Sequence, residues 1–294
     1  MKSGTVIFDN IAIVGVGLIG GSLGMAAKRR GIARHVIGIG RTEQKLMRAK
    51  ILGAIDEYSL DIENAADQAD LLVLCTPVQL VAPTLQRMAA SLKSGAIITD
   101  AGSTKREIVA ACDAVVPDGC FFVGGHPMAG SEQTGVDAAR ADLFAGATYV
   151  LTPGANTDLT ALGRMTEFAV GLGARVEILS PEEHDEAVAV ISHLPHAIAS
   201  ALMQLAEDSH RRTGKTFALA AGSFRDLTRI ADSSPELWRD ICLTNSDSLS
   251  EAISNLQESL SNLKSALQSR DGEAIQRFFE QSRQIRETYL RISQ

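Results

Sequence analysis

The feature that most constrains the fold is a glycine turn between an apolar run and a helical pattern. The run is NIAIV at residues 10–14, the turn is GVGLIG at residues 15–20, and helical spacing continues to residue 29. An apolar strand that leads through a glycine turn into a helix is the first half of a βαβ unit. The chain should therefore begin with an α/β fold.

The spacing of the glycines also predicts a ligand. Gly15 permits a tight bend, Gly17 lets the backbone approach a pyrophosphate, and Gly20 lets the helix pack closely on the strand. Leu18 and Ile19 then carry the first helical amides, which point at the phosphates together with the helix dipole. The turn predicts a dinucleotide site.

The first 180 or so residues alternate short β-branched runs with longer helical patterns, which is typical of a parallel sheet. Several runs are apolar throughout, as expected of strands that are covered on both faces. We expect a doubly wound sheet with strands at residues 11–14, 36–39, 71–75, 96–99, 121–124, 148–151 and 175–179.

The pattern changes at Pro181, after which strand-like runs disappear and apolar residues recur every three or four positions. Ser180 is a plausible N-cap for the first of these helices. We expect an α/β fold with two domains, a doubly wound sheet over residues 1–181 and an all-helical domain over residues 182–294. From Pro235 onward the sequence predicts two long amphipathic helices broken near 271–272, whose apolar stripes pack within the domain or against a second subunit.

Composition narrows the possible functions. A chain of 294 residues has enough core for two domains. Its net charge of −7 argues against a nucleic-acid partner, which needs a basic face. No apolar run approaches the roughly 20 residues that cross a bilayer, and the start lacks the core of a signal peptide, so we expect no membrane partner and a cytoplasmic location. The four cysteines form no C-x-x-C pair, which disfavours a zinc site or a disulfide framework.

The end of the second expected strand bears on the choice of cofactor. In NAD sites an acid at this place bonds the ribose 2′-hydroxyl, whereas this chain has Gly40. Arg41 and Thr42 can donate hydrogen bonds to a 2′-phosphate. We therefore expect NADP, with NAD possible if Arg41 is only a solvated charge. The segment Cys75, Thr76 and Pro77 follows the third expected strand and should lie along the same cofactor edge.

Ligands of open α/β sheets lie beyond the carboxyl ends of the strands. Two segments there carry reactive groups: TDAGSTK at residues 99–105 and GGHPMAGSE at residues 124–132. A neutral imidazole can accept a proton from an alcohol as hydride departs, so His126 is a candidate general base for a small-molecule substrate. Ser103 could orient it. The alternative is a structural histidine.

The helical half offers two further groups. His193 and His196 are three residues apart and share a helical face if the helix continues through the intervening proline. Without an H-E-x-x-H motif or a third ligand we expect no metal ion, and a substrate-facing role for one or both. Arg225 and Arg229 flank Asp226, so that one arginine can pair with the acid while the other binds a substrate carboxylate. A solvated helix face is the alternative.

Taken together, these segments resemble the prephenate/arogenate dehydrogenase (cyclohexadienyl dehydrogenase) family of tyrosine biosynthesis. The resemblance covers nearly the whole chain. It implies a Rossmann domain followed by a helical domain that forms a homodimer, with the active site in the cleft between them. The motifs that carry it are GVGLIGGS (15–22), DAGSTK (100–105), GHPMAGSE (125–132), SHLPH (192–196) and FRDLTRIA (224–231) running on to WRD (238–240).

The resemblance implies an NAD(P)-dependent oxidative decarboxylation, in which a cyclohexadienol gives hydride from C4, loses carbon dioxide and becomes aromatic. His126 matches the catalytic histidine and Ser103 the serine that positions the hydroxyl. Arg229 matches the arginine that holds a substrate carboxylate, and His196 a second active-site histidine. Asp226 and Trp238 match residues that organise the pocket of this arginine. Ser131 and Glu132 are added as candidate contacts to the side chain of the substrate.

Two other functions compete with this one. A β-hydroxyacid dehydrogenase shares a Rossmann domain followed by helices, but that class typically uses a lysine base on the helical domain. A non-catalytic NAD(P)-sensing protein would bind the cofactor without turnover. The family also contains members with an acid at the place of Gly40 and members with fused mutase or regulatory domains, for which this chain has no spare length.

Overall fold

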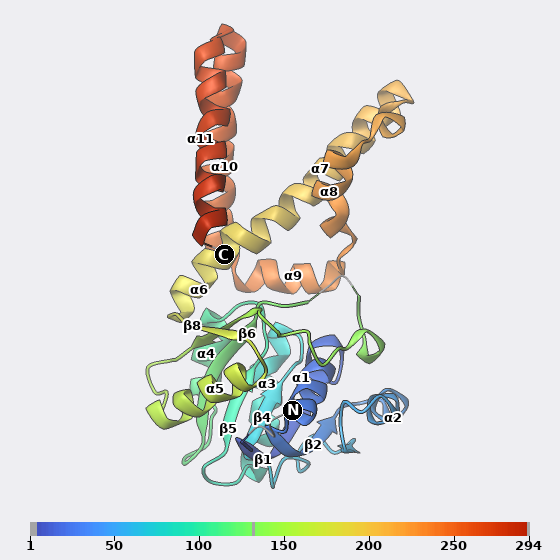
Figure 1. The fold of residues 1–294 in the computed structure, drawn as a ribbon, viewed down its shortest axis with the longest axis vertical. Helices are drawn as coiled ribbons and strands as arrows, with labels where there is room; N and C mark the ends of the chain where they lie inside the picture. The colour runs from blue at the N-terminus through green and yellow to red at the C-terminus, as the bar shows by residue number, and fades with distance from the viewer. Residues whose placement is uncertain (1–4, 131–132, 293–294) are drawn as a thin grey trace. The chain divides into compact units, whose positions relative to one another are not determined.

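The structure is a computed structural model that describes residues 5–130 and 133–292. The chain divides into two compact units, Met1–Ser246 and Asp247–Gln294. The first unit contains a sheet and the helices that follow it, and the second contains most of two long helices (Figure 1).

The sheet has eight strands in the order β3-β2-β1-β4-β5-β6-β7-β8. All seven expected strands form, and the order from β3 to β6 is that of the doubly wound dinucleotide-binding fold. The strands are β1 Phe8–Val14, β2 Ala33–Ile39, β3 Glu57–Ser59, β4 Leu71–Leu74, β5 Ile97–Asp100, β6 Phe121–Pro127, β7 Thr148–Thr152 and β8 Arg175–Ile178.

Two features of the sheet differ from the prediction. The edge strand β3 was not expected. It has only three residues, none of them buried, so its sequence lacks the apolar run by which the other strands were predicted. A wholly parallel sheet was expected, but β7 runs antiparallel to β6, with His126 opposite Val150. The described residues between β6 and β7 contain only the short 3-10 turn Val136–Ala138, so no helical crossover returns the chain to the same direction.

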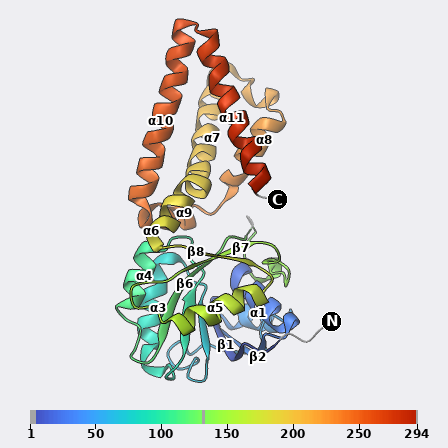
Figure 2. The same ribbon diagram turned by 60° about the vertical axis from the view of Figure 1, so that its left-hand side comes forward.

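Helices cover both faces of the sheet because side chains alternate along each strand. Ile11 and Ile13 join the hydrophobic cluster beneath α1 and α5, which lie on one face (Figure 2). Ala12 and Val14 join the cluster beneath α3 and α4 on the other face. The helices of this layer are α1 Leu18–Arg30, α2 Glu43–Ile51, α3 Val81–Met88, α4 Arg106–Asp113 and α5 Leu159–Gly171.

The helical part of the first unit starts where the sequence predicts. Ser180 and Glu183 form a reciprocal capping box at the start of α6, Pro181–Val188. A π-helical turn, Ala189–His193, leads directly into α7, Leu194–Thr213, so the helix does continue through the proline. Two shorter helices complete this part: α8 Gly222–Thr228 and α9 Pro235–Thr244.

The stretch Pro181–Thr213 is, by length and composition alone, long and apolar enough to cross a membrane, which the sequence reading did not anticipate. Only 22% of its most apolar window is buried. Exposed apolar side chains on a helix also mark surfaces that pack against another protein.

Beyond Pro235 the structure has three helices where two were expected. α9 ends at Thr244 and α10 runs over Ser246–Ser269, because Asn245 leaves helical geometry with φ −130° and ψ 37° and its side chain bonds to the α6 backbone. The second break is where the sequence places it: α11 begins at Gly272 and ends at Ile292.

Candidate functional site

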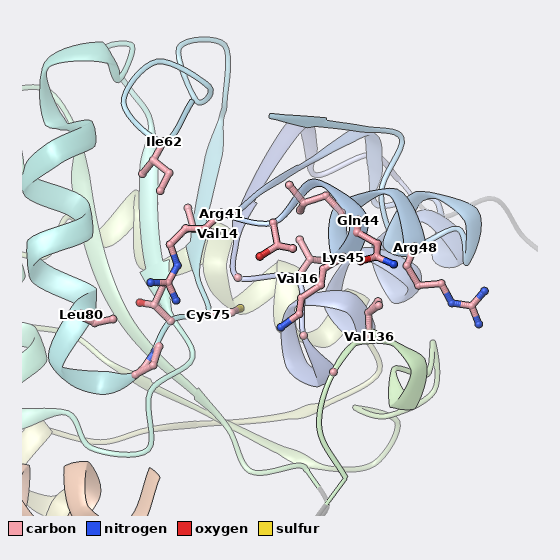
Figure 3. A pocket seen from close by; sticks show the side chains of 18 of the residues that line it. Val14, Val16, Arg41, Gln44, Lys45, Arg48, Ile62, Cys75, Leu80 and Val136 are labelled. Carbon is pink, nitrogen blue, oxygen red and sulfur yellow. The ribbon is translucent and has the colours of Figure 1, made fainter. Parts of the chain in front are cut away.

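A cavity of about 1090 Å³ lies at the carboxyl ends of β1, β2 and β4 (Figure 3). Three of the residues expected at the cofactor, Leu18, Ile19 and Gly20, lie in α1 and do not line it. Ser103 does not line it either. The expected cofactor residues that do line it are Gly15, Gly17, Gly40, Arg41, Thr42, Cys75, Thr76 and Pro77.

The glycine turn has the geometry that a pyrophosphate requires. Gly15 has φ +91°, and a Cβ there would lie 2.5 Å from the carbonyl oxygen of Cys75. A Cβ on Gly17 would meet nothing within 4 Å, so the backbone is open at this residue. Gly17 is also the N-cap of α1 and offers no side-chain cap to its amides. The residues present therefore fit a dinucleotide, whose pyrophosphate can accept hydrogen bonds from these amides.

The cavity is cationic beside α2. Figure 3 shows Arg41 and Lys45 extending into the pocket; Arg48 also lines it, but its guanidinium is turned towards Asp137. Arg48 bonds to Asp137, whereas the side chains of Arg41 and Lys45 form no ion pair or hydrogen bond within the described part of the chain. Thr42 caps α2 without using its side chain. Two positive charges and a hydroxyl are thus available to an anionic group.

A second cluster lies where β5 and β6 end. Lys105 donates from Nζ to the carboxylate of Asp100 and, at 2.8 Å, to the carbonyl oxygen of Gly125. The Asp100 carboxylate also accepts from the amides of Gly102 and Gly125 at 2.7 and 3.1 Å. These bonds fix the backbone on both sides of Ser103 and immediately before His126.

His126 is the first member of a chain of hydrogen-bonded side chains. Its Nδ1 lies 2.8 Å from Nε2 of His184, and Nδ1 of His184 lies 2.8 Å from Oδ1 of Asp185. Burial, with the charges of His184, Lys105 and His193, holds the pKa of His126 well below its usual value of 6.5. The imidazole of His126 is therefore neutral at pH 7 and can accept a proton.

Asp185 connects this chain to its surroundings. Its carboxylate accepts from the amides of Lys105 at 2.7 Å and Arg106 at 2.9 Å, at the start of α4. Its backbone oxygen accepts from Nδ2 of Asn245 at 2.8 Å, and the same amide group lies 3.2 Å from Nδ1 of His193. Burial lowers the pKa of His193 to about 4, despite the nearby charge of Asp185.

The two histidines of the SHLPH motif lie against Trp238. His196 stacks on the indole with 3.9 Å between ring centroids, and His193 meets it edge-on at 5.9 Å. Nδ1 of His196 bonds to the carbonyl oxygen of Ser192 at 2.9 Å. The contacts run without interruption from His126 on the sheet to His196 on α7, so the structure brings together four residues that the sequence singles out.

The other expected site residues are not part of the hydrogen bonds and ring contacts described above. Ser103 is half-buried in the loop between β5 and α4. Asp226 in α8 and Arg229, which begins the next 3-10 turn, are both exposed. Ser131 and Glu132 lie outside the described residues.

Sequence reasoning missed His184, Asp185 and Asn245. His184 and Asp185 follow the capping box of α6 and there look like ordinary first-turn polar residues. What marks them in the structure is that their polar side chains are wholly buried, and a sequence does not show burial. Lys105 and Asp100 were inside a motif but had no assigned role.

Residues 23–178 match the family described as "Prephenate dehydrogenase, nucleotide-binding domain", and residues 180–281 match "Prephenate dehydrogenase, dimerization domain". A prephenate dehydrogenase of Bacillus subtilis (strain 168) is 37% identical over 280 residues, which are 95% of this chain and 76% of that protein.

Two solved structures share the fold over nearly the whole chain. The prephenate dehydrogenase of A. aeolicus, in complex with hydroxyphenyl propionate and NAD+, superposes with a TM-score of 0.89 at 33% identity and covers 98% of this chain and all of that one. The Synechocystis arogenate dehydrogenase has a TM-score of 0.83 at 33% identity and covers 95% of this chain and 99% of that one.

Proposed function

Because the chain belongs to the prephenate dehydrogenase family, we propose that it converts prephenate, arogenate or both by NAD(P)-dependent oxidative decarboxylation. The products are 4-hydroxyphenylpyruvate and tyrosine respectively. The observation that carries the proposal is the neutral, hydrogen-bonded His126, which lies in a family motif at the carboxyl end of β6. The β-hydroxyacid dehydrogenase alternative lacks such support, since the buried Lys105 is paired with Asp100 on the sheet side.

A bound nicotinamide cofactor would supply the acceptor for the hydride that leaves C4 of the substrate ring. His126 accepts the proton of the C4 hydroxyl, for which its lowered pKa keeps it unprotonated. Ser103, whose flanking backbone is fixed by hydrogen bonds to Asp100 and Asp185, orients that hydroxyl. Loss of the ring carboxylate as carbon dioxide completes an aromatic product and makes the step effectively irreversible.

Binding of the substrate is assigned to the helical side. We propose that Arg229 holds a substrate carboxylate, since a guanidinium binds carboxylates bidentately. His193, His196 and Trp238 form an aromatic wall that suits a planar ring. We further propose that Asp226 organises the pocket of Arg229. Ser131 and Glu132 are the proposed contacts to the side chain of the substrate.

NADP is our proposed preference over NAD. Arg41, Lys45 and the uncapped start of α2 supply positive charge and donors beside the cavity. Glu43 in the first turn opposes this preference, but its carboxylate accepts a hydrogen bond from the Tyr58 hydroxyl at 3.1 Å.

We propose that residues 1–181 and 182–294 are separate domains, and that the second one forms a homodimer in the cytoplasm. The two family matches, which meet between residues 178 and 180, support the boundary. Apolar side chains exposed on α7 and, separately, on α11 support the dimer, because large exposed apolar surfaces mark protein–protein contacts. They include Ile198 and Leu205 on α7, and Phe279, Ile285 and Tyr289 on α11.

Steady-state assays that pair prephenate and arogenate with NAD and NADP test the proposal. We expect turnover in at least one pair and a higher kcat/KM with NADP. Absence of turnover in all four pairs would reject the dehydrogenase assignment. Cofactor binding without any turnover would instead favour the NAD(P)-sensing alternative.

A further inference from the structure

We propose that His184 and Asp185 are positioning residues that hold a proton on Nδ1 of His126 and so present Nε2 of His126 as the basic atom. This inference rests on the proposed catalytic role of His126. It assigns a role to two buried residues outside the motifs that the sequence singles out.

The carboxylate of Asp185 has donors whose direction is certain. Backbone amides can only donate, and those of Lys105 and Arg106 reach Oδ1 and Oδ2 at 2.7 and 2.9 Å. Two such bonds at the start of α4 favour the ionised carboxylate, which is an acceptor only. Nδ1 of His184, 2.8 Å from Oδ1, must therefore carry a proton and donate it.

The proton on Nδ1 of His184 fixes the next bond. A neutral imidazole has one donor and one acceptor, so Nε2 of His184 is the acceptor. Nδ1 of His126, 2.8 Å from it, then donates, and the lone pair of His126 is left on Nε2. The opposite direction would require a second proton on His184, which is wholly buried and lies between His126 and His193.

The same contacts prepare His126 for its charged state. When Nε2 accepts the hydroxyl proton, the O–H bond breaks, an N–H bond forms and the imidazole becomes a cation, while a bound nicotinamide would take up the hydride from C4. The Nδ1 hydrogen bond to His184 then strengthens, because its donor is charged and the Asp185 carboxylate lies behind it. The proton stays on His126 until it is released to solvent.

Asp185 also aligns the two halves of the site. It caps α4 immediately after the loop that carries Ser103, and through His184 it orients the ring of His126. Asn245 holds the backbone of Asp185 from the opposite side. One carboxylate thus sets the position of the base relative to the serine, which is the precision that proton transfer needs.

The test compares His184→Gln with His184→Leu. Glutamine places an amide oxygen near the position of Nε2 and can accept from Nδ1 of His126, whereas leucine fills the space without an acceptor. We expect kcat to fall about 10²-fold or more in the leucine variant and less than about tenfold in the glutamine variant, with similar dissociation constants for the cofactor.

Asp185→Asn is the isosteric companion. Its amide group can donate to Nδ1 of His184 and thereby reverse both hydrogen bonds, leaving a proton on Nε2 of His126. In hydrolase triads the equivalent exchange costs about 10⁴-fold in kcat through the wrong tautomer. We expect a loss of about 10²–10⁴-fold in kcat here, with KM little changed. This variant keeps the side-chain volume, so it decides the question if His184→Leu does not fold.

A pH profile and a double-mutant cycle separate positioning from packing. The groups that face His126 are His184, Lys105 and His193, with Asp185 and Asp100 behind the first two. Because the neutral His184 accepts from Nδ1 of His126 and so stabilises the protonated ring, His184→Leu should move the acidic limb of kcat/KM to lower pH. In a His126→Asn background, none of the three variants should reduce kcat further, because they act through His126.

Each outcome has a distinct meaning. Equal losses for glutamine and leucine, an unmoved acidic limb, or additive losses in the His126→Asn background would overturn the positioning role. If His126→Asn itself leaves turnover unchanged, the proposed function of His126 fails instead. If His126→Asn abolishes turnover while Asp185→Asn and His184→Leu do not lower it, only the present inference fails.

Discussion

Lys105 and Asp100 form an ion pair in which neither side chain is exposed to solvent. Lys105 also donates to the carbonyl oxygen of Gly125, so the pair joins the ends of β5 and β6. A buried ion pair contributes little net free energy, but removal of one partner leaves an uncompensated charge. Substitution of either partner should therefore destabilise the fold next to the candidate site.

Lys105→Met should lower the free energy of unfolding by about 3–5 kcal/mol, since Asp100 loses its cation in a dry environment. Urea unfolding measures the change. Arg34→Met is the matched control, because Arg34 pairs with Asp9 where both side chains are mostly exposed, and it should cost at most about 1 kcal/mol. Similar losses in the two variants would contradict the structural role of Lys105.

His126→Asn should reduce turnover about 10²–10⁴-fold and leave cofactor affinity unchanged, since it removes a general base. In the unmodified enzyme the lowered pKa of His126 keeps the base neutral below pH 6.5. The kcat/KM profile should therefore stay level through pH 6.5 as far as His126 is concerned, and fall only at lower pH. His35→Asn, at a half-exposed position on β2, is the control and should behave as the parent.

Arg229→Gln should chiefly raise the substrate KM, by about 10–100-fold, through loss of a charged hydrogen bond worth roughly 1.5–3 kcal/mol. Initial-rate kinetics at saturating cofactor separate KM from kcat. Arg211→Gln removes an exposed arginine that pairs with Glu207 on α7, and its KM should not move. An unaltered KM in Arg229→Gln would make Arg229 a solvated surface charge.

The double variant Arg41→Ala/Lys45→Ala should weaken NADP binding at least about tenfold and NAD binding by less than about twofold, because only NADP has a 2′-phosphate. Equilibrium titration of both cofactors measures the two affinities. Arg48→Ala is the control, as this side chain is engaged by Asp137. Equal weakening of both cofactors would argue against recognition of the 2′-phosphate.

Stability should depend on pH through His193. Its pKa is about 4 in the folded chain and near 6.5 when unfolded, so the unfolded chain binds the additional proton between these values. The neutral His193 contributes its full share to the free energy of unfolding above pH 6.5. This share falls by on the order of 3 kcal/mol as the pH falls towards 4. The stability difference between the parent and His193→Asn should shrink over that interval, as urea unfolding at several pH values would show. A constant difference would contradict the shift.

Local rules account for most of the fold that the sequence predicts. The glycine turn, the apolar strands and the cap at Ser180 depend on neighbours within a few residues, and each forms as expected. The antiparallel β7 and the helix break at Asn245 depend on distant partners. Asn245 ends α9 through a bond to a backbone oxygen 60 residues away, which no local pattern records.

The candidate site divides in the same way. His126 was predictable because the carboxyl ends of strands collect reactive groups. His184 and Asp185 were not, since their importance follows from the packing of α6 against β6 and the start of α4. Their polar character fits the start of a helix equally well, and only burial distinguishes the two roles.

The π-helical turn at Ala189–His193 gives the chain one extra residue immediately before α7. Deletion of a single residue there would restore ordinary winding and rotate every following side chain of α7 by about 100° relative to α6. His193 and His196 would then turn away from Trp238, and the apolar face of α7 would point elsewhere. Homologous sequences should accordingly tolerate substitutions in this turn far more readily than changes in its length.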